Sequence, residues 1–283
     1  MVSAMKSPRK SPGITDVNSK ADTGPRGLHI FPDVKALSQA VARNLADRIK
    51  TTLTAQASFS LVLAGGSTPG VLYQLLASEY RDQIPWAQLH LFWGDERYVP
   101  PSDPRSNYRM ACETLLGHVP VPKENLHPMP TEFPEAEEAA AAYERLLRNH
   151  FPAAWPRFDL VLLGMGPDGH TASLFPNSQA LDEQERWVAA SRAPVEPVQR
   201  LTLTLPVLNH AAQVYFLVAG AEKSGALRQA LAGKTDASDD WKRCPATAVQ
   251  PMQGVVTWWT DQAAAKLMEA SVQGGRQING RQA

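Results

Sequence analysis

The sequence predicts an α/β fold, a mostly parallel sheet flanked by helices on both faces. Two observations support this fold class. Short apolar runs with the length of buried strands recur along the chain, and stretches with helical periodicity alternate with them. Alternation of this kind is typical of parallel sheets, because a helix has to carry the chain back before the next parallel strand begins.

The first half of the chain shows the alternation most clearly. Leu37, Val41, Leu45 and Ile49 recur every four residues, which predicts an amphipathic helix. The elements expected after it are a strand at Phe59–Ala64, a helix at about Pro69–Ala77, a strand at Leu89–Trp93, a helix at about Asn107–Leu116 and an alanine-rich helix at Glu135–Asn149.

The second half repeats the pattern. The polar stretch Gly233–Arg243 predicts a long surface loop. Because no linker or internal repeat interrupts them, residues 27–270 are expected to form a single α/β catalytic domain. The polar residues 1–26 predict a disordered N-terminal arm, and residues 271–283 a flexible C-terminal tail. The elements expected here are strands at Phe158–Leu163, Arg200–Leu205, Val214–Val218 and Val255–Trp259, and helices at Ala221–Leu231 and Asp261–Ala270.

The composition excludes several classes of protein. The 28 Lys and Arg residues balance the 28 Asp and Glu residues, so no overall basic field favours binding to nucleic acid or to a membrane surface. No apolar run approaches the ~20 residues that span a bilayer. The two cysteines, Cys112 and Cys244, are too few for a disulfide framework, which indicates a cytoplasmic protein.

The sequence predicts neither a metal nor a cofactor. It contains no HExxH, no CxxC and no acidic metal-binding cluster. Most of its histidines have no motif of candidate catalytic or ligand-binding residues next to them in the sequence. We interpret these as structural or surface residues: His29, His90, His118, His127, His150 and His210.

The most informative segment, GMGPDGH, follows the strand Phe158–Leu163 and ends on His170. Histidine is the side chain best suited to move a proton near neutral pH. Glycines bring the backbone close to a ligand at the end of a strand, where open α/β sheets bind their ligands. The pattern assigns Asp168 no chemical role beyond the turn itself. The turn expected to line the site consists of Gly164, Gly166, Asp168 and Gly169.

The same letters match the G-x-G-x-x-G fingerprint of dinucleotide-binding proteins, but their surroundings argue against it. A helix opening here would meet Pro176 within about two turns. The acids about 20 residues further on, which begin at Asp182, precede the next apolar run, whereas a ribose-binding acid lies at the far end of that strand.

A second motif, GGSTPG at Gly65–Gly70, follows a strand and opens a helix. Free N–H groups at a helix N-terminus bind anions, and Pro69 suits the first helical turn, which Ser67 or Thr68 can cap. A Walker loop is excluded because no Gly-Lys-Ser/Thr follows. A nucleophile elbow is excluded because Pro69 stands where its second glycine would be. The motif therefore predicts a phosphate site.

Charged residues next to other strands complete this candidate site. Arg200 and Lys223 each adjoin a predicted strand, and a guanidinium and an ammonium group together suit a phosphate. Asp95 and Arg97 come just after the strand Leu89–Trp93, at the end of the strand where ligands bind. The predicted phosphate ligands are Gly66, Ser67, Thr68, Arg200 and Lys223.

Four motifs in one order resemble the glucosamine-6-phosphate isomerase/6-phosphogluconolactonase family, from about Phe31 to Leu267. The resemblance implies a modified Rossmann-like α/β sandwich. It also implies hydrolysis of 6-phospho-D-glucono-1,5-lactone to 6-phospho-D-gluconate in the oxidative pentose phosphate pathway, without a cofactor. The motifs are LAGGSTPGVLYQLLA at Leu63–Ala77, WGDERYVPPSDPRSNY at Trp93–Tyr108, GMGPDGHTASLFP at Gly164–Pro176 and RLTLTLPVLNHA at Arg200–Ala211.

The resemblance leaves two other functions to weigh. The deaminase members of the family carry a glutamate five residues after the histidine, where this chain has Phe175, and this departure favours the lactonase. Related folds also serve as sugar-phosphate sensors in transcription regulators. Those proteins carry a helix-turn-helix domain, for which residues 1–26 are too short and too rich in Pro and Gly.

The resemblance implies a mechanism without a covalent intermediate. His170 is expected to take the proton from water and then to assist release of the ring oxygen. Asp95 orients the substrate or the histidine, Arg97 stabilises charge at the reacting carbon, and backbone N–H groups of 166–169 contribute to the same task. The partner implied is a small-molecule sugar-phosphate lactone, and the sequence leaves protein partners open.

Overall fold

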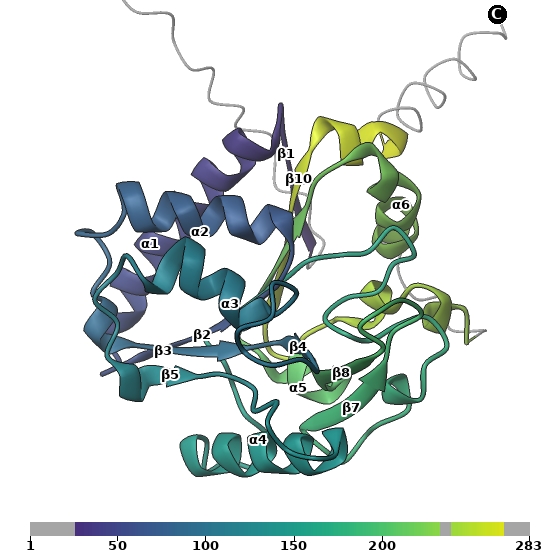
Figure 1. Cartoon of the computed structure of the whole chain (residues 1–283). Helices are drawn as coiled ribbons and strands as arrows, with labels where there is room; N and C mark the ends of the chain where they lie inside the picture. The colour runs from purple at the N-terminus through teal and green to yellow at the C-terminus, as the bar shows by residue number, and fades with distance from the viewer. Residues whose placement is uncertain (1–25, 233–238, 269–283) are drawn as a thin grey trace, which may run out of the picture.

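Seven parallel strands form the central sheet of the computed structural model, which describes residues 26–232 and 239–268. Their order across the sheet is β1-β10-β9-β6-β2-β3-β5 (Figure 1). The parallel sheet predicted from the alternating pattern is therefore confirmed. The strands are β1 (Arg26–Phe31), β2 (Phe59–Leu63), β3 (Leu89–Trp93), β5 (Leu126–His127), β6 (Leu160–Leu163), β9 (Gln213–Val218) and β10 (Val255–Asp261).

The strand order reverses between β2 and β6. After β2 the chain adds β3 and β5 on one side, whereas β6 lies on the other side of β2 and is followed by β9 and β10. The segments that leave β2 and β6 therefore diverge and open a crevice at the carboxyl ends of the strands. This reversal places the two glycine-rich motifs of the sequence side by side.

A second, smaller sheet extends from β3. It contains β4, β8 and β7 in that order, with both pairs antiparallel. Gly94 joins it to the central sheet, because its N–H donates to the carbonyl of Leu63 and its carbonyl accepts from Leu203. The strands are β4 (Asp95–Arg97), β7 (Val188–Arg192) and β8 (Gln199–Leu203).

Helices cover both faces of the central sheet. In Figure 1, α1, α2 and α3 lie above the strands β2, β3 and β5, and α4 lies below them. The predicted periodicity of α1 is confirmed, since Leu37, Val41, Leu45 and Ile49 are fully buried. The helices are α1 (Val34–Leu53), α2 (Ser67–Glu79), α3 (Asn107–Ala111), α4 (Ala136–His150), α5 (Leu205–His210) and α6 (Ser224–Ala232), and residues 262–268 are also helical.

Short helical turns fill several connections. A π-helix, η2, continues α3 to the end of the helix that the sequence predicts there. The others are 3₁₀ turns. Together they are η1 (Trp86–Gln88), η2 (Cys112–Leu116), η3 (Lys123–Asn125), η4 (Gln179–Leu181), η5 (Ala221–Lys223), η6 (Asp239–Arg243) and η7 (Pro245–Ala248).

Several boundaries differ from those predicted. Arg26 belongs to β1 and not to the predicted arm; residues 1–25 and the tail 271–283 lie outside the described residues. Asp261 ends β10 and accepts the N–H of Ala264, so it caps the last helix from outside. Residues 239–243 of the predicted loop form η6, and 233–238 are not described.

The first and last strands lie side by side, because β1 pairs with β10. Strands from both ends of the described chain therefore share one sheet, and we propose that residues 27–270 form a single domain. None of the described helices is long and apolar enough to cross a membrane.

Candidate active site

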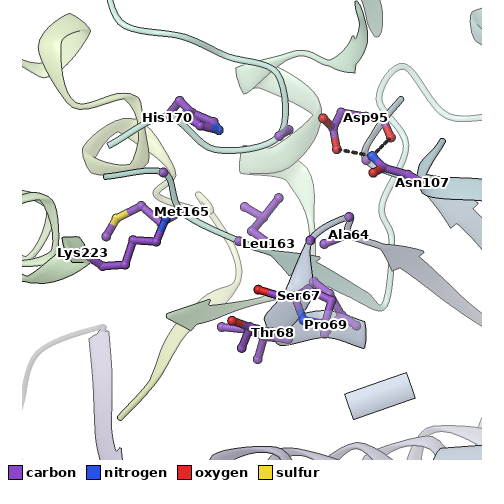
Figure 2. Close-up of a pocket in the computed structure, with 18 of the residues that line it drawn as sticks. Ala64, Ser67, Thr68, Pro69, Asp95, Asn107, Leu163, Met165, His170 and Lys223 are labelled. Carbon is purple, nitrogen blue, oxygen red and sulfur yellow. Dashed lines mark hydrogen bonds between the residues drawn. The ribbon is translucent and has the colours of Figure 1, made fainter. Parts of the chain in front are cut away.

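A cavity of about 260 Å³ opens at the carboxyl ends of the central strands. Segments that follow β2, β3, β6 and β9 form its walls. Figure 2 shows His170 and Asp95 on one side and Ser67 and Thr68 on the opposite side. The cavity brings together most of the predicted site residues: Gly66, Ser67, Thr68, Asp95, Arg97, Gly164, Gly166, His170 and Lys223. The other predicted site residues do not line it: Asp168, Gly169 and Arg200.

Asp168 binds the ring of His170 directly. Nδ1 of His170 lies 2.6 Å from Oδ1 of Asp168, which also accepts the backbone N–H of His170 at 3.2 Å. A carboxylate at Nδ1 favours the tautomer with its proton there, which leaves Nε2 free to accept a proton. Burial alone would raise the pKa of Asp168, but the hydrogen bond and charge of His170 outweigh burial and hold that pKa below its usual range.

The glycines of this turn make room for the pair. A Cβ on Gly166 would lie 2.1 Å from Nδ1 of His170. Gly169 has a φ of 82° and packs against Cys244, whose Sγ would be 2.5 Å from a Cβ. Side chains at these two positions would displace His170 or strain the backbone. Gly164 has more space, since the nearest atom to its Cβ would be the carbonyl oxygen of Gly65 at 3.9 Å.

Two backbone N–H groups of the turn, those of Gly166 and Gly169, already have partners within it, so these two are not free for the oxyanion that the sequence led us to expect there. Gly166 donates its N–H to the carbonyl of His170 at 2.8 Å, and Gly169 donates to the carbonyl of Gly166 at 3.0 Å. Pro167 has no N–H to offer. The tight turn consumes these donors because it has to close on itself within a few residues.

Two hydrogen bonds hold the carboxylate of Asp95 at the cavity. Its Oδ2 accepts the hydroxyl of Ser173 at 2.7 Å, and its Oδ1 accepts Nδ2 of Asn107 at 3.2 Å, which Figure 2 draws as a dashed line. A Cβ on Gly65 would lie 2.0 Å from Oδ1 of Asn107. The first glycine of GGSTPG therefore leaves space for the amide that positions Asp95.

Helix α2 points its N-terminus into the cavity. Gly66 is the N-cap with a φ of 101°, and no side chain caps the helix, so the predicted capping by Ser67 or Thr68 is wrong. The helix starts one residue earlier than a Ser67 cap would require, because glycine adopts this φ without strain. The first amides of the helix and the hydroxyls of Ser67 and Thr68 therefore face the cavity, a typical anion site.

Lys223 and Arg97 bring positive charge to the cavity. Lys223 lies at the end of η5, with its Nζ 3.9 Å from Oε1 of Glu222, which also lines the cavity. Arg97 donates from Nη1 to the carbonyl of Arg105 at 2.5 Å. The contact with Arg105 holds the guanidinium of Arg97 in place, whereas the contact of Lys223 is with the adjacent residue of its own turn.

Arg200 lies apart from the other predicted phosphate ligands. It faces Arg97 across the β4–β8 pair and is only 6% exposed. Its Nε and Nη1 have no hydrogen-bond partner in the described part of the chain. Burial and the charge of Arg97 lower the pKa of Arg200. Its role as a phosphate ligand stays a prediction.

Glu96, between Asp95 and Arg97, is structural. Its buried carboxylate accepts the N–H groups of Arg97, Asn107 and Tyr108 and the hydroxyl of Ser106. Burial raises the pKa of Glu96, and these hydrogen bonds oppose the rise. The carboxylate fixes the start of α3, and with it the Asn107 side chain.

Sequence reasoning did not select three residues of the site. Asn107 and Ser173 hold Asp95, and Glu222 lies beside Lys223. Each stands inside or next to a motif, but contacts between segments give these residues their roles. Spacing along the chain does not show such contacts.

The fold and the site together define a class of protein: an α/β protein whose crevice sets a histidine–carboxylate pair against an anion-binding helix N-terminus. The family model described as glucosamine-6-phosphate isomerases/6-phosphogluconolactonase matches residues 32–258. The chain belongs to this family, which confirms the resemblance seen in the four motifs.

Individual relatives agree. The chain is 42% identical to the 6-phosphogluconolactonase of Synechocystis sp. over 222 residues, which is 77% of this chain and 88% of that protein. It matches the solved structure of a 6-phosphogluconolactonase from Trypanosoma brucei with a TM-score of 0.73 at 31% identity, over 86% of this chain and 98% of that one. A monomeric glucosamine-6-phosphate deaminase shares the fold alone, with a TM-score of 0.70 at 22% identity over 85% of this chain and 99% of that one.

Proposed function

We propose that this chain hydrolyses 6-phospho-D-glucono-1,5-lactone to 6-phospho-D-gluconate in the oxidative pentose phosphate pathway. Membership of the family and relatives called 6-phosphogluconolactonase support this hydrolase activity. The observation that carries the choice within the family is Phe175, whose ring lies 4.7 Å from the His170 ring between centroids. An apolar ring cannot replace the glutamate that the deaminase members use for proton transfer.

In this proposal His170 is the general base. Its Nε2 takes a proton from water, and the water oxygen bonds to the lactone carbonyl carbon. Asp168 stabilises the imidazolium that forms, through the 2.6 Å contact at Nδ1. The carbonyl electrons then return, the bond from carbon to the ring oxygen breaks, and the imidazolium gives its proton to that oxygen. The step needs no covalent enzyme intermediate.

Asp95 and Arg97 position and stabilise the reacting end. The carboxylate of Asp95, held by Ser173 and Asn107, accepts a substrate hydroxyl. The guanidinium of Arg97 stabilises the negative oxygen of the tetrahedral intermediate. The N–H groups of Gly166 and Gly169 already donate within the turn, so they do not share this task.

The phosphate lies at the other side of the cavity, on the N-terminus of α2. The Gly66, Ser67 and Thr68 segment supplies N–H and hydroxyl donors, and Lys223 supplies the opposite charge. Binding the remote phosphate holds the lactone next to His170 in a reactive pose. The cytoplasmic location and the lack of a nucleic-acid partner remain predictions from composition.

The test compares two substrates with one preparation of the full chain. Freshly made 6-phosphogluconolactone is hydrolysed with and without protein, and the spontaneous rate is subtracted. We expect acceleration with the lactone and no turnover of glucosamine 6-phosphate. Turnover of the amino sugar instead would assign the site to the deaminase reaction. If a folded sample turned over neither substrate, the result would indicate a protein that binds sugar phosphates without catalysing a reaction.

A further inference from the structure

Three histidines meet outside the cavity, on the part of the sheet formed by β3 and β5. His90 is the second residue of β3, His127 ends β5, and His150 is the last residue of α4. Their possible ligand atoms all lie within 4.8 Å of one another, and all three side chains are half-buried. Three segments that are far apart in the sequence thus deliver one imidazole each to the same place.

The spacing of the donors fits a transition-metal ion. Nδ1 of His90 lies 3.1 Å from Nε2 of His127. Two nitrogens bound to one tetrahedral Zn²⁺ at about 2.0–2.1 Å would be roughly 3.3 Å apart. Two of the three donors already lie near this separation, and the ligand atom of His150 lies within 4.8 Å of both.

The facing nitrogens of His90 and His127 are held together either by one shared proton or by one cation between them. In the metal-free protein only one of the facing nitrogens carries a proton and donates it to the other. When a metal binds, the donor imidazole changes tautomer: its proton moves to the other nitrogen of the same ring. The two facing nitrogens then both have a lone pair free to bind the metal. No net proton is released, because both imidazoles stay neutral.

The surroundings keep the rings in the form that binds metals. Phe92 stacks on His127 with centroids 4.5 Å apart, and its ring lies 5.0 Å from the ring of His150. Burial, and then the charges of His150 and His90, lower the pKa of His127 to about 4. Burial also lowers the pKa values of His90 and His150. Neutral imidazole is the metal-ligating form.

The cluster is separate from the proposed active site. His90 stands four residues before Gly94, which lines the cavity, and an extended strand covers about 13 Å over that length. None of the three histidines lines the cavity. A metal at the cluster would therefore join β3, β5 and α4 without touching the lactone.

We propose that His90, His127 and His150 bind one Zn²⁺ or a similar borderline transition-metal ion through three imidazole nitrogens. Water completes the coordination, since no carboxylate or thiolate belongs to this cluster among the described residues. The ion ties the edge strand β5 and the end of α4 to the sheet. Because none of its ligands lines the cavity, we assign the ion a structural role, and its binding stabilises the folded chain by mass action.

The first experiment titrates the chelator-treated full chain with Zn²⁺ and follows histidine imidazole resonances by NMR. We expect His90, His127 and His150 to shift or broaden together at one equivalent. This measurement uses the wild-type protein and does not depend on a variant that has to fold. Changes confined to His170, or no change at any histidine, would overturn the proposal.

Calorimetry with Zn²⁺ provides the second experiment. The variant His150→Gln removes the ligand at the end of α4. We expect it to bind Zn²⁺ at least about 10-fold more weakly than wild type and to lose the rise in Tm that Zn²⁺ gives. His118→Gln, outside the cluster, is the matched control and should behave as wild type. Equal affinity in all three proteins would contradict the proposal.

Discussion

The contact between His170 and Asp168 is the residue-scale feature on which the proposed chemistry depends. Sequence reasoning selected His170, because a histidine after a glycine-rich turn at a strand end is well placed for proton transfer. It gave Asp168 no chemical role, since a separation of two residues along the chain does not imply that the side chains of Asp168 and His170 touch. The backbone of the turn, with a φ of 82° at Gly169, curls the two side chains together.

Asp168→Asn should therefore lower kcat by about 10- to 100-fold while the protein stays folded. Asparagine keeps the shape and an acceptor, but it loses the charge that stabilises the imidazolium. Steady-state hydrolysis of the lactone measures the effect, with Asp82→Asn, an exposed acid, as the control. A kcat equal to that of wild type would remove Asp168 from the mechanism.

The same substitution changes how stability depends on pH. The pKa of Asp168 is lower in the folded chain than its ordinary value near 3.8, so its ionised form stabilises the fold. This contribution is complete above the ordinary pKa and is lost as pH falls through the lowered one. Urea unfolding should show wild type more stable than Asp168→Asn near neutral pH, with a difference that shrinks below about pH 4. A difference that grows towards acid pH would contradict this sign.

At the scale of elements, the starts of two helices, α2 and α3, position groups at the site. Helix α2 begins at a glycine cap and leaves its first amides for a ligand. Helix α3 begins on the buried carboxylate of Glu96, which fixes Asn107 and, through it, Asp95. From GGSTPG the sequence predicted a helix start with amides free for an anion, although it placed the cap at Ser67 or Thr68 and not at Gly66. It did not predict the second, because the acceptor comes 11 residues earlier and only the fold brings it back.

Glu96→Ala should destabilise the protein by about 2–4 kcal/mol. The substitution leaves buried N–H and hydroxyl donors of the α3 start without their acceptor, and Glu96 is only 2% exposed. Chemical unfolding at neutral pH measures the loss, with the exposed Glu79→Ala as control. A loss below about 0.5 kcal/mol, the scale of an exposed site, would show that the carboxylate is not needed there.

At the scale of the whole molecule, the reversal of strand order assembles the site. It places the loop after β2 opposite the loop after β6, and η5 after β9 adds Lys223. The alternating pattern predicted the parallel sheet and most helices, since each buries a periodic apolar face. It missed β1, β4, β5, β7 and α5, because short segments such as Leu126–His127 carry too few residues to show a period.

The cluster of His90, His127 and His150 shows the same limit. No histidine of the three stands in a motif of its own segment, so the sequence predicted all three to be structural or surface residues. Only the pairing of β3 with β5, and the end of α4 beside them, brings them within 4.8 Å. Arg200 is the opposite case: it stands in a recognisable motif, but the fold buries it away from the cavity surface.

Lys223→Ala tests whether the crevice works as one unit. If Lys223 binds the remote phosphate, its loss should raise KM about 10-fold or more and change kcat at saturation much less. Lys50→Ala, an exposed lysine on α1, is the matched control. A variant with unchanged KM would move the phosphate away from Lys223, and Arg200→Ala would then decide whether Arg200 takes its place.

The most direct measurement is the kcat of His170→Ala for 6-phosphogluconolactone, with the enzyme-free rate subtracted. We expect a fall of about 10²-fold or more, the usual effect of losing a general base. His118→Ala, an exposed histidine outside the cavity and the cluster, should keep wild-type kcat. A folded His170→Ala protein with normal kcat would contradict the central claim that His170 activates the water.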